Sequence, residues 1–108
     1  MRIEQLEKNL SDKGFKKEHL DTGIEYAKEI DHIQLICYIE PNINIAITTI
    51  YKWKNNDVKG GFTVSYPQLE RVESVTTLFK ETLSDMPEYV GERNIHIDIR
   101  KTIDKIFN

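Results

Sequence analysis

The sequence predicts an α+β fold: an antiparallel meander sheet of about four to five strands, with N-terminal and C-terminal helices packed on one face. Three observations predict it. Apolar and polar residues alternate in consecutive segments between residues 24 and 66, short turns join those segments, and segments with helical spacing flank them. With 108 residues, the chain is expected to form a single α+β domain, 1–108.

The first element is predicted to be a helix over residues 2–13. An apolar stripe at helical spacing supports it, made of Ile3, Leu6 and Leu10. Gly14 stands where a left-handed residue would end the helix, and Phe15 follows where it would fold back onto Leu10. This arrangement is typical of a Schellman motif.

Four strands are predicted next, at residues 24–28, 32–40, 43–53 and 58–66, with turns at 40–42 and 55–57. The clearest alternation lies in the third strand, in Ile43, Ile45, Ile47, Thr49, Tyr51 and Trp53. The opposite face of that strand is mixed in character. A central position is therefore expected, with one face on the core and the other partly exposed.

A second helix is predicted over residues 67–83, because Ser65 and Gln68 have capping-box spacing and Pro67 suits a first turn. Its apolar stripe would be Leu69, Val72, Val75, Phe79 and Leu83. The alternation of Ile95, Ile97 and Ile99 then predicts a short strand, followed by a helical turn over 102–107. In the alternative interpretation, residues 94–99 join the last helix.

Composition narrows the class of protein. The net charge is −3, from 15 Lys and Arg against 18 Asp and Glu spread evenly along the chain, which argues against nucleic-acid binding. No apolar run approaches the ~20 residues that span a bilayer, and no signal peptide is evident, so a cytoplasmic location is expected. The fifteen Ile and two Ala suggest an AT-rich genome, such as that of a low-GC bacterium or its phages.

No standard catalytic, nucleotide-binding or metal-binding signature occurs, so no cofactor and no metal are expected. Cys37 lies in phase with buried strand residues, and this favours a small hydrophobe over a nucleophile. His96 and Asp98 would share one face of the predicted strand, a spacing that suits a metal or an oriented base. A simple exposed polar face explains the same pair.

Two groups of residues are candidate contact surfaces for a partner protein. Glu70, Glu73 and Glu81 lie off the apolar stripe of the second predicted helix and would suit a basic partner. In Tyr51, Lys52, Trp53 and Lys54, with Lys59 nearby, aromatics alternate with cations, as in single-stranded nucleic-acid sites. In strand phase, however, the aromatics and the lysines point to opposite faces, which favours a protein contact at Tyr51, Trp53 and Lys54.

The sequence therefore predicts a small cytosolic non-catalytic protein-binding module, in the manner of an inhibitor or adaptor encoded by a phage or mobile element. Its partner would be another protein, not a nucleic acid or a membrane. Two alternatives stay open. One is a homodimeric chaperone-like or structural protein, and the other is a small ligand-sensing protein or enzyme that uses His96, Asp98 and Cys37.

Overall fold

A computed structural model describes the backbone of residues 1–54, 57–90 and 92–108, and the side chains of these residues except 53–54, 57–60 and 90. Its elements, in chain order, are α1 (Ile3–Asp12), β1 (Lys16–His19), β2 (Ile24–Ile30), β3 (Ile33–Glu40), the 3₁₀ helix η1 (Pro41–Ile43), β4 (Ile45–Lys54), β5 (Asp57–Tyr66), the 3₁₀ helix η2 (Leu69–Arg71), α2 (Val75–Ser84), β6 (Tyr89–Val90), β7 (Arg93–Asn94) and α3 (Ile95–Phe107).

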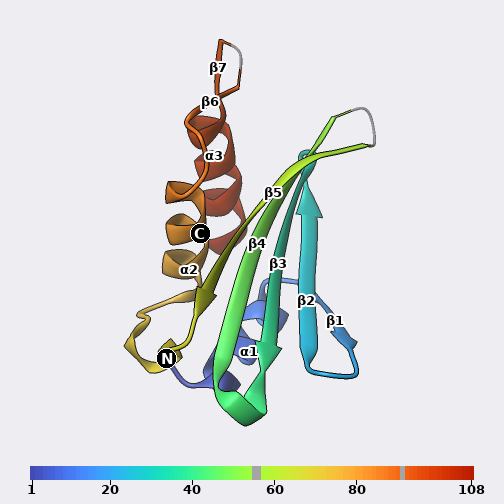
Figure 1. Cartoon of the computed structure of the whole chain (residues 1–108), viewed down its shortest axis with the longest axis vertical. Helices are drawn as coiled ribbons and strands as arrows, with labels where there is room; N and C mark the ends of the chain where they lie inside the picture. Colours follow the sequence, from blue (N-terminus) through green and yellow to red (C-terminus); the bar gives the residue numbers. More distant parts are fainter. Residues whose placement is uncertain (55–56, 91) are drawn as a thin grey trace.

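The five strands β1 to β5 form one sheet in chain order, and every neighbouring pair is antiparallel. The helices pack against one face of this sheet, and Figure 1 shows α1 behind the strands. β6 and β7 pair separately as a short hairpin before α3. The predicted α+β meander with N-terminal and C-terminal helices is confirmed.

The core lies between the sheet and the helices. One cross-strand row shows which side of each strand faces it: Tyr26 of β2 pairs with Cys37 of β3, which pairs with Thr48 of β4. All three side chains are buried. Three stacked rings, with centroids 5.8–6.0 Å apart, join the chain after α1 to α2 and α3: Phe15, Phe79 and Phe107.

The end of α1 is as predicted. The Phe15 N–H donates to the Leu10 carbonyl at 3.1 Å, and the Gly14 N–H donates to the Ser11 carbonyl at 3.0 Å. These are the two bonds of a Schellman motif. Gly14 has φ +82°, a conformation that glycine adopts without a steric penalty. The turn reverses the chain so that it enters the sheet at β1.

β4 is a central strand, as predicted, and its core side is the mixed one. Ala46, Thr48 and Ile50 are fully buried under the helices, whereas Ile45 and Ile47 are only partly buried on the other side. Small side chains on the covered side let α2 approach closely, and the hydroxyl of Thr48 bonds that of Thr82 on α2. The isoleucine row of β4 therefore faces away from the core.

The helix predicted over residues 67–83 is wrong in its first half. Residues 69–71 form η2, the chain is then extended at Val72, and α2 begins only at Val75. The cap is Ser74, whose side chain accepts a hydrogen bond from the Thr77 N–H at 3.1 Å, rather than the predicted Ser65 and Gln68. A bent segment keeps Leu69 buried as a straight helix would, so the apolar spacing alone did not distinguish them.

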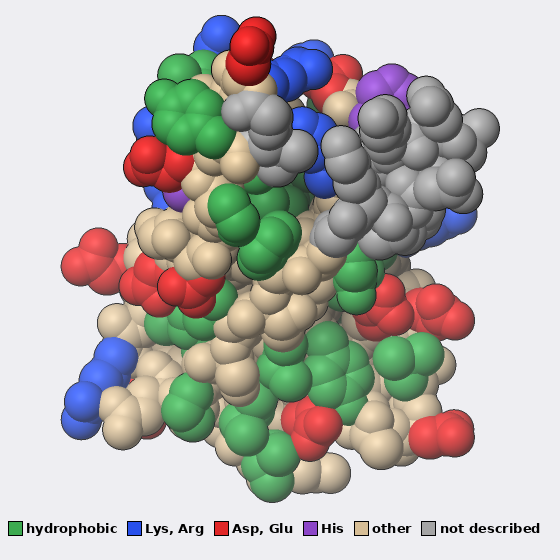
Figure 2. Space-filling view, turned by 45° about the horizontal axis from the view of Figure 1, so that its top comes forward, with side chains coloured by type: hydrophobic (Ala, Val, Ile, Leu, Met, Phe, Trp, Pro, Cys, Tyr) green, Lys and Arg blue, Asp and Glu red, His purple; other side chains and the backbone are tan. Residues whose placement is uncertain are grey.

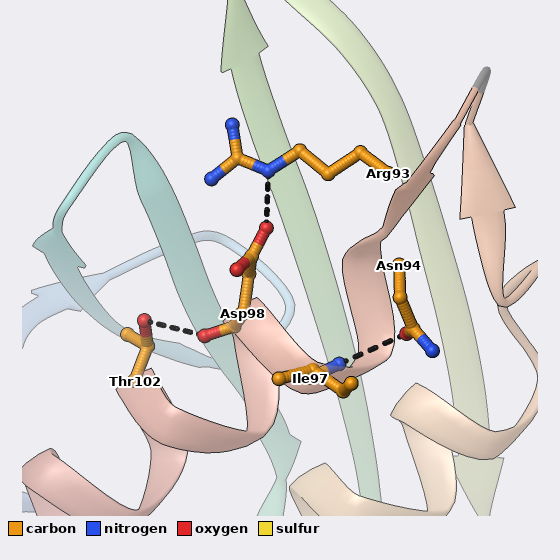
Figure 3. Close-up of polar contacts among 5 residues, drawn as sticks. All are labelled: Arg93, Asn94, Ile97, Asp98 and Thr102. Atoms are coloured by element: carbon orange, nitrogen blue, oxygen red, sulfur yellow. Dashed lines mark hydrogen bonds and ion pairs between the residues drawn. The ribbon is translucent and has the colours of Figure 1, made fainter.

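The strand predicted over residues 95–99 is also wrong, because these residues form the first turn of α3. Asn94 caps this helix by accepting from the Ile97 N–H at 3.1 Å (Figure 3). Ile95 and Ile99 are buried, whereas Ile97 is 47% exposed, as expected for a period of 3.6 rather than 2. The alternative interpretation, in which residues 94–99 join the last helix, is the correct one.

A further strand, β1, was not predicted from the sequence. Its four residues are Lys-Lys-Glu-His and all are exposed, so no alternation of apolar and polar residues marks it. It forms the edge of the sheet beside β2. A short, charged edge strand is one way in which proteins discourage unwanted pairing with other chains.

Candidate protein-binding face

The sheet surface that points away from the helices, named here the open face, is set by strand register. Because Tyr26, Cys37 and Thr48 point into the core, their neighbours along each strand point outward. The outward residues include an apolar group, made of Ala27, Ile36, Tyr38, Ile45, Ile47 and Tyr51. They also include four carboxylates, at Glu18, Glu25, Glu29 and Glu40.

The apolar group on the open face is separate from the core. Every member is partly buried rather than buried, and the strand isoleucines Ile36, Ile45 and Ile47 are not among the partly buried hydrophobic residues that pack against the core. Cross-strand pairing sets Tyr38 opposite Ile47 and Gln34 opposite Tyr51. The centre of the sheet thus presents isoleucine and tyrosine side chains that none of α1, α2 and α3 covers.

Both tyrosines of the open face lie against glycines. A Cβ on Gly61 would overlap the ring of Tyr51, its cross-strand partner, and a Cβ on Gly23 would come within 2.9 Å of the Tyr38 ring. The Tyr38 hydroxyl also donates to Glu40 Oε1 at 2.9 Å and bonds Thr22 Oγ1 at 2.5 Å. These contacts hold the two rings along the sheet surface and give the face a defined shape.

Charge on the open face is mostly negative. Glu18 and Glu25 pair across β1 and β2, Glu29 lies further along β2, and Glu40 ends β3. Lys16 is the basic residue that shares this face on β1. Figure 2 shows hydrophobic side chains spread over the lower half of this view, with carboxylates among them and to their right.

Of the predicted contact residues, Tyr51 lies on the open face. Trp53 and Lys54 belong to β4, but their side chains fall outside the described part of the structure. Lys52 points to the opposite face from Tyr51, as strand phase predicted, and contributes to a cleft beside α3.

The three predicted contact glutamates do not share one helical face. Glu70 lies in η2, Glu73 lies in the extended stretch that follows, and Glu81 lies on α2. All three are exposed, and Glu70 Oε2 accepts a hydrogen bond from Asn44 Nδ2 at 2.8 Å. The physical reason is that α2 begins at Val75, after the first two of these residues.

His96 and Asp98 do not share a face, because they lie two residues apart on a helix rather than on a strand. His96 is buried, with Nε2 2.8 Å from the Met86 carbonyl, to which it donates as a structural hydrogen bond. Asp98 turns outward and pairs with Arg93 (Figure 3). That guanidinium, with smaller contributions from Lys52 and Lys101, lowers the pKa of Asp98.

Cys37 is fully buried, and desolvation raises the pKa of its thiol to about 12. It is protonated at neutral pH and lies in the core row between Tyr26 and Thr48. The hydrophobe interpretation is therefore supported by its surroundings. Within the described residues, no group of three or more His, Cys, Asp and Glu side chains is arranged to hold a metal ion.

The sequence pattern did not indicate most of the open face, namely Ile36, Tyr38, Glu25 and Glu29. One signal could have revealed Ile36 and Tyr38. In both β3 and β4 the residues on either side of the alternation are apolar, so each strand has more apolar surface than one core can cover. Once β4 is turned so that Ala46 and Thr48 face the helices, its isoleucines and those of β3 must share the other face.

Comparison of the chain with protein-family models, with curated proteins and with solved structures found no match. Among the helices of the described residues, none is both long enough and apolar enough to cross a membrane.

Proposed function

We propose that this chain is a non-catalytic protein-binding module that docks another protein on the open face of its sheet. The observation that carries this proposal is the uncovered apolar centre of that face, made of Ile36, Tyr38, Ile47 and Tyr51. A contiguous apolar patch with a polar border is the usual mark of an interaction surface. Tyrosines held flat are also well suited to binding, because little side-chain entropy is lost when a partner packs on them.

The size of the face indicates that its border takes part in binding. Five strands about 4.8 Å apart, over about six residues each, give a surface of roughly 400 Å². This is about half of the ~800 Å² that each partner buries in a standard interface. A stable complex therefore extends beyond the apolar centre to the surrounding carboxylates.

The charges of that border define the partner. Glu18, Glu25 and Glu29 lie together on the β1–β2 side of the open face. A partner that supplies an apolar centre and Lys or Arg opposite these carboxylates would complement them and would associate faster at low salt. A second copy of this chain would instead bring like charges together, so we assign the face to a different protein with a basic border. This chain would then act by covering that basic surface, as an inhibitor or adaptor does.

Affinity capture with matched variants tests the proposal. The immobilised wild-type protein is compared with an Ile36→Thr/Ile47→Thr variant in a host lysate, with quantitative mass spectrometry as the readout. Thr keeps the β-branched shape that suits a strand and removes apolar area. We expect at least one basic protein to be retained by the wild type and lost, about tenfold or more, by the variant. A lysate in which every retained protein binds both forms equally would overturn the proposal.

Charge reversal separates the open face from the acidic residues elsewhere. Glu25→Lys and Glu29→Lys should each weaken capture of that same protein, and the loss should shrink as salt is raised. Glu81→Lys, an identical charge change at an exposed position of α2, is the control and should leave capture unchanged. If Glu81→Lys weakened capture and Glu25→Lys did not, the helix side would be the interface. Light scattering that showed a dimer abolished by Ile36→Thr/Ile47→Thr would favour a second copy instead.

A further inference from the structure

A cleft with a different character lies on the helix side of the sheet. Its volume is about 350 Å³, within the size range of small-molecule sites. Three parts of the chain line it: the β2–β3 turn with the first residue of β3, at Asp31 and Ile33, the far end of β4 at Lys52, and the β7–α3 segment. From the last come Arg93, Asp98, Lys101 and Lys105. Blue basic side chains gather at the top of Figure 2, at this end of the molecule.

The lining of the cleft is positive although the chain as a whole carries a net charge of −3. Four cations face it, at Lys52, Arg93, Lys101 and Lys105, against two carboxylates, at Asp31 and Asp98. Lys105 Nζ lies 3.4 Å from Asp31 Oδ2, and Arg93 Nε donates to Asp98 Oδ2. Among the lining residues, cations thus outnumber carboxylates by four to two.

Asp98 shows how the cations converge. Its pKa is lowered first by the hydrogen bond from Arg93 and further by the charges of Lys52 and Lys101, so three cations from three elements act on one carboxylate. Figure 3 shows the two terminal nitrogens of Arg93 pointing away from Asp98. Because Arg93 uses Nε for that ion pair, its terminal N–H groups keep their capacity to donate to an anion.

We propose that this cleft binds a small phosphate-bearing anion. Phosphate fits better than a monocarboxylate for two reasons. A phosphate monoester carries about −1.5 to −2 charges at pH 7, so it gains more than a monocarboxylate does from a lining in which cations outnumber carboxylates. Its several acceptor oxygens can also engage cations from more than one element, here Arg93 of β7 and Lys101 of α3, and a guanidinium is the preferred partner for such oxygens.

The test is a titration of the ¹⁵N-labelled protein with inorganic phosphate and with pyrophosphate, followed by NMR. Sodium chloride at matched ionic strength is the reference. We expect saturable shifts at the Arg93 Nε–H and at amides around Lys101, with pyrophosphate binding more tightly. Shifts no larger than those caused by chloride, or shifts that never saturate, would overturn the proposal.

Substitutions in the cleft are expected to change the affinity for pyrophosphate in opposite directions. Arg93→Gln and Lys101→Gln should each weaken pyrophosphate binding about tenfold or more, the usual effect of losing one charge-assisted hydrogen bond. Asp98→Asn should strengthen binding, because it removes a carboxylate that competes for Arg93. Arg100→Gln is the matched control, since Arg100 is exposed on α3 but does not line the cleft. Equal losses in Arg93→Gln and Arg100→Gln would show non-specific attraction and would contradict the site.

Two further experiments distinguish a free phosphate ligand from a lipid headgroup. If the ligand is a free molecule, a nucleoside diphosphate such as ADP should compete with pyrophosphate for the cleft. A lipid headgroup predicts instead that vesicles containing a phosphoinositide sediment with the wild-type protein and not with Arg93→Gln. The open-face variant Ile36→Thr/Ile47→Thr should bind pyrophosphate like the wild type, so failure of the cleft proposal and failure of the protein-binding proposal are distinguishable.

Discussion

The two faces of the β-sheet are formed by the same strands but lie in opposite environments, since the helices cover one face and leave the other uncovered. On the covered face β4 presents Ala46, Thr48 and Ile50, and all three are fully buried by the helices. On the open face the same strand presents Ile45, Ile47 and Tyr51, which are larger on average and yet remain partly exposed, together with the buried Thr49. The more hydrophobic side of the strand is therefore not the side in the core.

This difference shows what determines which side of a strand packs in the core. The helices bring bulky side chains, such as Phe79 and Leu78 of α2, and small residues on β4 leave space for them. Close packing needs complementary volumes, not the largest apolar residue at each position. The isoleucines on the open face stay partly exposed to solvent in the isolated chain, which is unfavourable. A docked protein would remove that exposure.

The largest effect that tests this comparison is on folding stability. Leu35 and Ile36 are adjacent in β3 and point to opposite faces, with Leu35 fully buried. We expect Leu35→Ala to lower the free energy of unfolding by about 2–5 kcal/mol, because it leaves a cavity in the core. Ile36→Ala should cost about 1 kcal/mol, near the full span of strand propensity. Urea denaturation followed by circular dichroism measures both.

Equal costs for the two substitutions would contradict the assignment of faces. A larger cost for Ile36→Ala would mean that the open face is packed against protein in solution, for example in a dimer. Repeating the denaturation at several protein concentrations checks this possibility, since only a dimer has a midpoint that depends on concentration.

A second effect uses the buried thiol of the covered face. Cys37 has an ordinary pKa near 9, and burial raises it to about 12. The folded protein therefore holds this proton more tightly than the unfolded chain does. Its stabilising contribution is complete below pH 9 and is lost as the pH rises toward 12, by at most about 1.4 kcal/mol per pH unit.

Denaturation midpoints measured between pH 8 and pH 12 test this expectation. The wild type should lose stability more steeply across that range than Cys37→Ala, which has no thiol to ionise. Tyr26, whose pKa burial raises to about 12, ionises in the same range in both proteins, and its small electrostatic coupling to Cys37 is part of the difference between them. Parallel curves for the two proteins would show that Cys37 is accessible to solvent.

The same contrast explains how much of this structure the sequence predicts. The meander and the Schellman end of α1 follow from local signals, since alternation, turn residues and Gly14 act over only a few neighbours. The start of α2 and the nature of residues 95–99 depend on tertiary packing. Ile95 and Ile99 satisfy both a strand and a helical spacing, and burial of Ile103 and Ile106 on the same stripe decides for the helix.

The candidate site is predicted less well than the fold. Tyr51 was found because aromatic residues alternate with cations over residues 51–54, whereas Tyr38 and Ile36 lie in a segment that also supplies the core residues Leu35, Cys37 and Ile39. Which face a strand buries is a property of the partner layer, and no single strand carries that information. The cleft beside α3 joins residues 31, 52 and 93–105, and a local pattern cannot bring these together.

The smallest expected effect is the difference between removing two tyrosine hydroxyls, one on the covered face of the sheet and one on the open face. The Tyr66 hydroxyl is buried and donates to the Leu78 carbonyl at 2.6 Å, which also accepts from Thr82 Oγ1 at 3.0 Å. Tyr66→Phe should lower the free energy of unfolding by about 1–2 kcal/mol, because a buried hydrogen bond is lost without a solvent replacement. Tyr38→Phe removes a hydroxyl that bonds Glu40 beside solvent, and water replaces that bond, so it should change stability by less than about 0.5 kcal/mol. Thermal and urea unfolding of both variants measure the difference, and a Tyr38→Phe cost equal to that of Tyr66→Phe would contradict an open face in contact with water.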